Sequence, residues 1–302
     1  MGFLDKWVES LDYEYEVLTS CTRYKSPRST CQSCFDACEH DAITSVNNRP
    51  FIKNDKCVEC GICIAACPVQ AVAGIFPKRT VIQNKLLVTG EHLPTVKEML
   101  VLYKKGVSEI IGEDSSLTES WQQVIKEANS ILHQLGEDSF NVSDKAFEKT
   151  EEVYSRRELF TQWKKESQTL VKQFAPAKWR FNHKDLDVAK YYPDYQFTKI
   201  TLNPDKCTLC KACEVLCEKK CLNITDSSFS IAAQACSSCR LCVEICPEKA
   251  ISLEEKISKV QDIHYPIYKR KCSICNQVYD SFHDYGEKCT TCTNGFLSPY
   301  IS

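Results

Sequence analysis

The chain has 302 residues, a net charge of −2 and a sequence pI of about 6.3. Because acidic and basic residues nearly balance, the chain lacks the basic footprint of a nucleic-acid-binding protein. The N-terminal residues show no basic stretch followed by an apolar run, and no apolar run in the chain approaches membrane-spanning length. We therefore expect a soluble, cytoplasmic protein of two or three domains, without a membrane span and without a nucleic-acid partner.

Twenty-one cysteines are the main feature of the composition. They fall into three groups, at residues 21–67, 207–246 and 272–292, and none occurs between the first group and the second. In a long chain without a secretory signal, cysteines that repeat at C-x2-C spacing indicate metal ligands rather than disulfides.

The first group contains one interrupted and one intact motif. The opening stretch "CTRYKSPRSTCQSCFDAC" keeps only the last two spacings of a cluster motif, in Cys31, Cys34 and Cys38. Arg28 stands where the first cysteine is expected, and the nearest upstream cysteine is Cys21. The run "CVECGICIAACPVQAV" from Cys57 has the full spacing C-x2-C-x2-C-x3-C-P. Between the two, "AITSVNNRPFIKND" predicts a strand, a turn and a strand.

Residues 80–136 predict a small β-α-β-α insert without cysteine. "NKLLVTG" and "VSEIIGED" predict strands, and "LPTVKEMLVLYKKG" predicts a helix that ends before Gly106. Ser116 and Glu119 predict a capping box for a second helix, whose apolar spacing continues to Gly136. Because no Gly-x-Gly-x-x-Gly follows either strand, we expect a structural and docking role rather than nucleotide binding.

Residues 143–197 predict a long charged helix followed by an irregular, aromatic-rich connection. Apolar residues recur along the helix to Phe174, and Pro176 ends it.

The second cysteine group repeats the organisation of the first. "CTLCKACEVLCEKKCL" begins at Cys207 and "CSSCRLCVEICPEKAI" begins at Cys236, and "LNITDSSFSIAAQA" between them predicts a strand, a turn and a strand. Glu218 replaces the proline of the first of these runs, as Glu39 does in the opening stretch. The order motif, hairpin, motif therefore occurs twice, which predicts two similar modules at residues 15–75 and 198–256.

The third group predicts a zinc-ribbon-like segment over residues 265–302. Two C-x2-C knuckles lie thirteen residues apart, and their four sulfurs fit a structural zinc site: Cys272, Cys275, Cys289 and Cys292. The second choice is a rubredoxin-type iron, but the prolines and glycines typical of rubredoxin knuckles are missing. We expect His283, between the knuckles, to lie on the surface because four sulfurs already fill a tetrahedron.

The paired motifs resemble the bacterial-type two-cluster [4Fe-4S] ferredoxin family, present twice. The resemblance implies an α+β fold with two ferredoxin-like dicluster modules, the α/β insert with its long helix, and the C-terminal zinc ribbon. In that family the fourth cysteine of each motif binds the other motif's cluster. Carried over to the first module, this implies one site of Cys21, Cys31, Cys34 and Cys67, and another of Cys57, Cys60, Cys63 and Cys38. In the second module it implies one site of Cys207, Cys210, Cys213 and Cys246, and another of Cys236, Cys239, Cys242 and Cys217.

Two interpretations of the interrupted motif stay open. In the favoured one, Cys21 is the fourth thiolate of a [4Fe-4S] cluster and residues 22–30 form an inserted loop, whose closure costs little entropy. In the other, three cysteines hold a [3Fe-4S] cluster and Cys21 is not a ligand. The loop cations Arg23, Lys25 and Arg28 would raise the cluster's potential, contact an acidic partner, or be solvated.

Two further departures from the motif concern single residues. A glutamate at position 39 or 218 would lower the potential of a cluster if it is buried, and would have little effect if it faces water. Cys221 lies outside the ligand sets and aligns with Ala42, Ala71 and Ala250. We expect it to pack as a small buried residue; the alternative is that it exchanges with Cys217 as a ligand upon oxidation.

No catalytic constellation accompanies the four predicted clusters. We therefore predict a non-catalytic electron-transfer subunit that acts as a relay in a cytoplasmic oxidoreductase complex. The expected partner is a larger redox subunit, and a molybdopterin oxidoreductase is a candidate by analogy alone. The alternatives are a free-standing polyferredoxin and an Fe-S/zinc regulatory or assembly protein.

Overall fold

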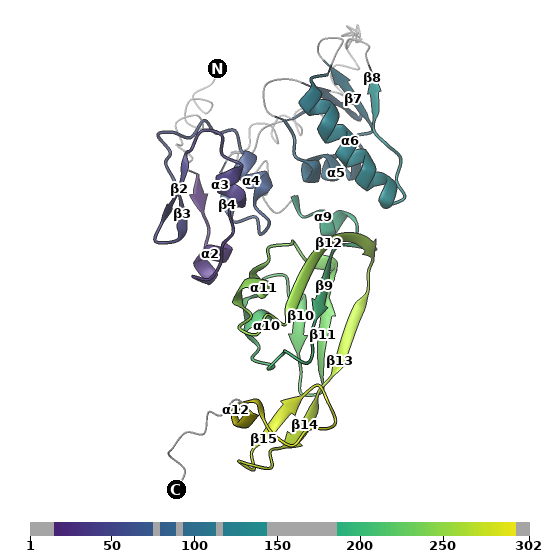
Figure 1. The fold of residues 1–302 in the computed structure, drawn as a ribbon. Coiled ribbons are helices and arrows are strands. Elements are labelled where there is room, and N and C mark those ends of the chain that lie inside the picture. Colours follow the sequence, from purple (N-terminus) through teal and green to yellow (C-terminus); the bar gives the residue numbers. More distant parts are fainter. Residues whose placement is uncertain (1–14, 75–78, 89–92, 113–116, 144–185, 294–302) are drawn as a thin grey trace, which may run out of the picture. The chain divides into compact units, whose positions relative to one another are not determined.

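A computed structural model describes residues 15–74, 79–88, 93–112, 117–143 and 186–293 (Figure 1). These residues mix short helices with small sheets, so the fold is of the α+β type. The chain divides by its contacts into two units: unit 1 is Met1–Cys21 with Gln32–Tyr191, and unit 2 is Thr22–Cys31 with Tyr192–Ser302. In the described part of the chain, no helix combines the length and the apolar character needed to cross a membrane.

The cysteine-containing part of unit 1 is built from two strand pairs and two short helices. Its elements are β1 (Glu16–Val17), α3 (Ser33–Asp36), β2 (Ile43–Val46), β3 (Arg49–Ile52), α4 (Ile62–Ala66) and β4 (Val72–Ala73). Strands β2 and β3 form the predicted hairpin, and its turn residues Asn47 and Asn48 both have positive φ. Strand β1 pairs antiparallel with β4. The core of this part includes Tyr15, Ile64 and Val72 together with cysteine side chains.

The cysteine-free part of unit 1 is a four-stranded sheet with two helices. Its elements are β5 (Thr80–Ile82), β6 (Lys85–Val88), α5 (Val96–Lys104), β7 (Glu109–Gly112), α6 (Glu119–Gln134) and β8 (Asn141–Ser143). The strand order is β5-β6-β7-β8, in which β6, β7 and β8 are parallel and β5 is antiparallel. The strands and helices that the sequence predicts are present, and the edge strands β5 and β8 are additions that it does not predict.

Helix starts in this part differ from the prediction at one point. Thr95 caps α5 by accepting a hydrogen bond from the Glu98 N–H at 3.3 Å. Thr118 caps α6 by accepting from the Trp121 N–H at 3.4 Å, so the predicted capping box is wrong: Glu119 is already the first helical residue. Strand β8 includes Ser143, where the long helix was expected to start; that helix lies outside the described residues.

Unit 2 contains α2 (Thr22–Lys25) and a longer run of elements from Tyr195 onward. These are β9 (Tyr195–Leu202), α10 (Ala212–Leu216), β10 (Leu222–Ile224), β11 (Ser228–Ala232), a 3₁₀ turn (Ala233–Ala235), α11 (Leu241–Ile245), β12 (Ile251–Lys259) and β13 (Asp262–Pro266). Strand β9 pairs antiparallel with β12, and β10, β11 and β13 form an antiparallel sheet. Phe229 and Ile231 of β11 are fully buried in the core.

Two boundaries in this region differ from the sequence prediction. The connection expected to be irregular up to residue 197 contains helix α9 (Val188–Tyr191) and the start of β9. In β9, every second residue from Gln196 to Leu202 is buried, because successive side chains of a strand point to opposite faces of the sheet. Beyond the expected module end at residue 256, β12 continues to Lys259 and β13 joins the sheet of β10 and β11.

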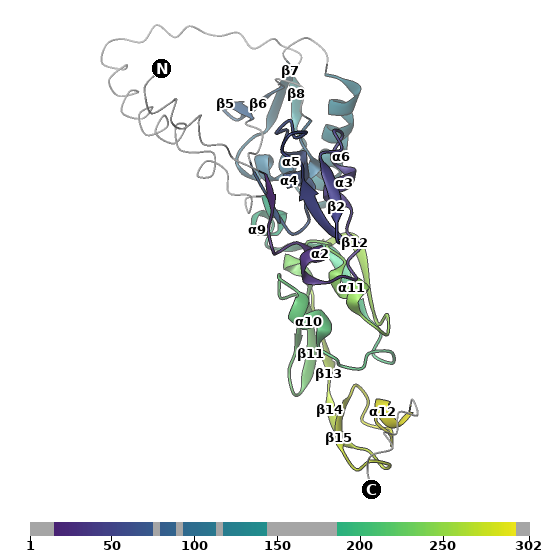
Figure 2. The same ribbon diagram turned by 90° about the vertical axis from the view of Figure 1, so that its left-hand side faces the viewer.

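The C-terminal segment is a hairpin followed by a short helix: β14 (Tyr268–Lys271), β15 (Val278–Ser281) and α12 (Thr290–Thr293). Figure 2 shows β13 leading directly into this segment. Phe282, just after β15, lies against Phe229 of the unit 2 core, with ring centroids 6.2 Å apart. This buried aromatic contact therefore joins the C-terminal segment to the core of unit 2.

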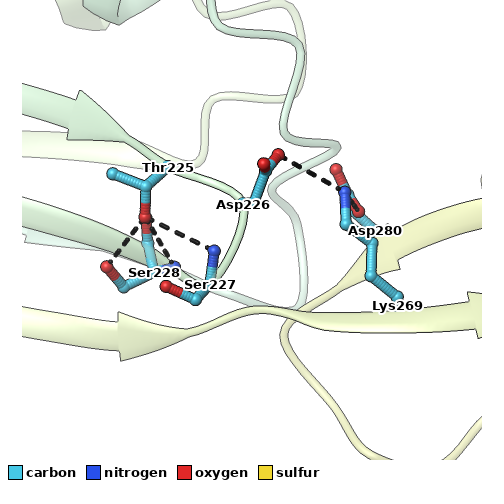
Figure 3. Close-up of polar contacts among 6 residues, drawn as sticks. All are labelled: Thr225, Asp226, Ser227, Ser228, Lys269 and Asp280. Atoms are coloured by element: carbon cyan, nitrogen blue, oxygen red, sulfur yellow. Dashed lines mark hydrogen bonds and ion pairs between the residues drawn. The ribbon is translucent and has the colours of Figure 1, made fainter.

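A polar contact supports the same junction. In the turn between β10 and β11, Thr225 Oγ1 accepts hydrogen bonds from the N–H groups of Ser227 and Ser228 (Figure 3). From β14, the Lys269 Nζ lies 3.6 Å from the Asp226 carboxylate and 2.8 Å from that of Asp280. The ordered turn thus presents an acidic group to the neighbouring hairpin.

Candidate metal centres

Three of the four cysteine runs share an unusual backbone conformation. In each, the residues immediately before and after the second cysteine have positive φ, between 55° and 71°: Glu59 and Gly61, Leu209 and Lys211, and Ser238 and Arg240. This left-handed conformation is strained for any residue except glycine. Among the described residues between Cys31 and Cys38, none has positive φ, so the interrupted run is also different in backbone.

The last cysteine of each run is followed by a common turn. The third residue after it has positive φ in all four runs: Asp41, Gln70, Lys220 and Lys249. In three runs the next N–H donates to the cysteine sulfur, from Ala71 to Cys67 at 3.2 Å, from Cys221 to Cys217 at 3.4 Å, and from Ala250 to Cys246 at 3.2 Å. A donor aimed at sulfur favours the thiolate, which is the form that binds metal.

In unit 2, four cysteines from two different runs line one cavity. Cys207 and Cys210 come from the loop before α10, Cys213 lies in α10, and Cys246 comes from the end of α11. Burial first, and then the neighbouring thiols of the other three, raise the pKa of Cys213 to about 12. Thiols that repel one another in this way are all ionised only when a cationic centre compensates their charge. The residues that line this cavity therefore fit a metal centre.

The remaining four motif cysteines of unit 2 are also neighbours. Burial first, and then the neighbouring thiols of Cys239, Cys236 and Cys217, raise the pKa of Cys242 to about 12. Cys217 again comes from the other run, at the end of α10.

Cys221 lies beside this second group. It is 2% exposed, as expected for a packing residue. Its side-chain hydrogen bonds lower the pKa of Cys217 to about 6 and that of Cys236 to about 7, while they raise its own pKa. The contact with Cys236, which comes from the other run, is a feature that the sequence does not predict.

In unit 1, the run from Cys57 has a matching neighbourhood. Burial first, and then the neighbouring thiols of Cys60, Cys57, Cys34 and Cys38, raise the pKa of Cys63 to about 12. Cys38 therefore lies near the run that the ferredoxin resemblance assigns to it.

The Tyr15 side chain packs against this group of cysteines, a contact that the sequence does not predict. Its side chain is 3% exposed, and its hydroxyl donates to the Glu59 carbonyl at 3.0 Å. Gly74 lies against the ring, where an added Cβ would come within 2.4 Å of Tyr15 Cδ1. The only signal in the sequence is a glycine directly after a short strand, which is too common to identify a contact.

The interrupted run is divided between the two units. Cys21, Cys34 and Cys67 belong to unit 1, and Cys31 belongs by its contacts to unit 2. Cys21 and Cys34 are buried, and the Cys21 N–H donates to the Leu18 carbonyl at 3.0 Å. The ligand set proposed for this run stays a prediction.

The C-terminal cysteines form a compact group. The sulfurs of Cys272, Cys275, Cys289 and Cys292 all lie within 4.8 Å of one another. The Cys275 and Cys289 sulfurs are 3.8 Å apart, which equals the separation of about 3.8 Å expected for two thiolates on a tetrahedral zinc. The backbone N–H groups of Cys275 and Cys289 lower the pKa of Cys272 to about 6. The four sulfurs therefore fit a metal ion of this kind.

His283 is not part of this group. Its Nε2 lies 2.9 Å from the Asp205 carboxylate, and its ring stacks on that of Tyr285. The side chain is partly exposed, in agreement with the surface position expected from the sequence.

Comparison with known proteins identifies one of the runs. Residues 50–73, which contain Cys57, Cys60, Cys63 and Cys67, match the family model of the 4Fe-4S binding domain. A relative named "Ferredoxin 7Fe", from Hydrogenibacillus schlegelii, is 40% identical over 40 residues, which are 13% of this chain and 51% of the relative. The chain thus spans about half the length of that relative. It contains a 4Fe-4S ferredoxin segment and a separate C-terminal group of four cysteines whose sulfurs could hold a metal ion.

Proposed function

We propose that this chain is an iron–sulfur electron-transfer protein that carries four [4Fe-4S] clusters in two paired modules and one zinc ion in the C-terminal segment. The observation that carries the proposal is the cavity lined by Cys207, Cys210, Cys213 and Cys246, which brings together two separate runs. When bound, each cluster accepts and releases one electron at a time.

The proposed ligand sets are those of the two-cluster ferredoxins. The neighbours of Cys63, Cys213 and Cys242 support exchange of the last cysteine between runs, because each has the last cysteine of the other run nearby. The order of elements supports a repeat of the module. Unit 1 has β1, α3, the β2–β3 hairpin, α4 and β4; unit 2 has β9, α10, the β10–β11 hairpin, α11 and β12, and in both the outer strands pair antiparallel.

The protein's own groups have three tasks in this function. Backbone N–H groups, such as that of Ala250, point at the sulfurs and stabilise their negative charge. Apolar residues such as Ile245 and Ile251 exclude water from the sites. Cys210 is the exposed ligand of its set, so this is the side on which we expect electrons to exchange with a partner.

A three-iron cluster bound by Cys31, Cys34 and Cys67 is the second candidate for the interrupted run. The name of the relative supports it, because seven iron atoms equal one three-iron and one four-iron cluster. The substitution Cys21→Ser separates the candidates. Loss of one iron atom or a changed cluster spectrum indicates that Cys21 is a ligand, whereas an unchanged iron content and spectrum indicate a three-iron site.

We further propose that the protein is a relay subunit of a cytoplasmic oxidoreductase, bound to a larger redox subunit that is a molybdopterin enzyme by analogy alone. The sheet of β5 to β8 and the C-terminal hairpin support a permanent partner, since a diffusing carrier needs neither. Stable co-purification with a catalytic subunit is the expected result. Isolation as a free chain with fully reducible clusters would favour a polyferredoxin, and clusters that decompose on oxidation would favour a regulatory protein.

Metal analysis of the anaerobically purified chain tests the cluster proposal. We expect about sixteen iron atoms, equal sulfide and one zinc per chain. Eight iron atoms or fewer, or disulfides between the motif cysteines, would contradict it.

A further inference from the structure

The loop inserted between Cys21 and Cys31 is ordered by its own polar contacts. Thr22 and Ser29 are each 1% exposed, and Ser29 Oγ donates to Thr22 Oγ1 at 2.9 Å. The Arg23 guanidinium is also buried, and its Nε donates to the Cys31 carbonyl at 2.6 Å. The loop therefore has a defined shape, and Arg23 is not one of the solvated cations that the sequence allows for.

One contact of the loop with the second module lies at the position after the last cysteine, where two other runs have a proline. In two runs a proline, Pro68 or Pro247, follows the last cysteine and fixes the backbone that leaves the ligand. In the run from Cys207 this position is Glu218, whose carboxylate forms an ion pair with Lys25 of the loop. The ion pair holds the Glu218 carboxylate beside Cys217.

A second set of contacts reaches the end of α11. Thr30 binds the Glu244 carboxylate twice, through its N–H at 3.2 Å and its Oγ1 at 2.5 Å. Arg28 Nη1 donates to the Ile245 carbonyl at 3.4 Å, directly before Cys246. Hydrogen bonds to a carboxylate are among the stronger ones in proteins, so this contact has a defined geometry.

We propose that residues 22–31 are an intramolecular clamp that positions Cys217 and Cys246 for the clusters of the second module. The inference rests on the proposed function, because these two cysteines are the ligands that each run supplies to the other run's cluster. By holding the chain beside Cys217 and Cys246, the clamp keeps each of these two ligands at the cluster of the other run. Lys25 and Arg28 also bring positive charge to these ligands, which favours the more negative, reduced clusters.

The rate of cleavage by trypsin measures whether the loop is held in place, because Lys25 and Arg28 are cleavage sites that the clamp protects. In the iron-loaded full chain, we expect Glu218→Ala together with Glu244→Ala to speed cleavage within the loop roughly tenfold, because the charge-assisted contacts are lost. We also expect faster loss of cluster absorbance to an iron chelator. The matched control is Glu39→Ala, which removes an exposed glutamate from the same position of another run and should change none of these.

A charge exchange tests the contact itself. Cleavage after Arg28, a site that both variants keep, measures the effect: Lys25→Glu alone should speed it, and Lys25→Glu with Glu218→Lys should restore the wild-type rates of this cleavage and of cluster loss. Wild-type rates of cleavage and cluster loss in the double alanine variant at full iron content would overturn the clamp. Iron analysis before the protease is added keeps the questions separate: a wild-type chain that binds no iron contradicts the proposed function, whereas unprotected sites in a fully loaded chain contradict the clamp.

Discussion

Lys211 and Arg240 occupy a backbone conformation that usually belongs to glycine. They correspond to Gly61 in the first module, and all three have positive φ. The strain costs a side-chain-bearing residue about 1 kcal/mol or more, so the packing around the cysteines must offset it. Lys211 and Arg240 directly follow the second cysteine of their runs, so the strained conformation belongs to the turns that carry the proposed ligands.

A reciprocal pair of substitutions tests this strain. We expect Arg240→Gly to stabilise the second module by about 1 kcal/mol, and Gly61→Ala to destabilise the first by a similar amount. The guanidinium concentration at half loss of the cluster absorbance measures both. Arg49→Gly, at an exposed strand position with ordinary φ, is the control and should not stabilise. A stability loss on Arg240→Gly would show that the arginine side chain matters more than its backbone.

The contact of Gly74 with the Tyr15 ring leads to a second prediction at this scale. In Gly74→Ala the new Cβ would come within 2.4 Å of the ring, so Tyr15 must move off the run from Cys57. Overpacking of this kind costs about 1–3 kcal/mol, and cluster loss from the first module should accelerate. Tyr15→Phe keeps the ring and removes only the hydroxyl, so it should have a smaller effect. Equal effects of the two variants would mean that the hydrogen bond to Glu59, and not the close packing, holds the ring.

Helix α5 is attached to the chain before β5 by a buried ion pair. The Glu98 side chain is 4% exposed, and its two oxygens accept from Arg79 Nε at 2.7 Å and Nη2 at 3.1 Å. The planar guanidinium matches the carboxylate in this two-point contact. Such a pair specifies where the helix starts against the sheet more than it adds net stability.

Removing one partner should therefore cost more than removing both. We expect Arg79→Met to destabilise this part of unit 1 by about 3–5 kcal/mol, because an uncompensated carboxylate is left buried, and Arg79→Met with Glu98→Met to recover most of the loss. Chemical unfolding followed by tryptophan fluorescence reports on this part when Trp7, Trp163 and Trp179 are replaced by Phe, which leaves Trp121, buried in α6, as the emitter. A double variant as unstable as the single one would show that the pair itself supplies the stability.

At the scale of the whole molecule, the C-terminal hairpin and the cluster-binding part of unit 2 share a core but carry different metals in our proposal. Phe282 lies against Phe229, and Lys269 approaches Asp226 in the turn of the neighbouring hairpin. Because the four sulfurs of the proposed zinc site all come from residues 272–292, loss of the zinc should unfold the knuckles while the β9–β12 pair and its cysteine runs persist.

Selective removal of zinc tests this division. Treatment with a zinc chelator should release one zinc per chain and expose four thiols to a thiol reagent, with little change of the cluster absorbance. Cys275→Ser should give the same result without chelator. Release of iron together with zinc would mean that the hairpin is required to keep the clusters bound.

Features that depend on neighbours along the chain could be predicted from the residues alone. Cysteines two and three residues apart can bind one centre only through tight turns, and the β2–β3 and β10–β11 hairpins follow from turn residues between β-branched stretches. The helices of the insert follow from their apolar periodicity, although the start of α6 differs because Thr118 is the better placed cap. These features could be predicted because each is encoded within a few residues.

Contacts between residues far apart in the chain could not be predicted in this way, because they depend on the packed fold. Lys25 and Glu218 are 193 positions apart, and no local pattern shows that a loop beside the first motif would contact the turn after Cys217. The cover of Tyr15 over the run from Cys57 and the contact of Cys221 with Cys236 are hidden for the same reason. Such contacts depend on how complete elements pack, and that packing is decided by the sum of many weak interactions over the whole fold.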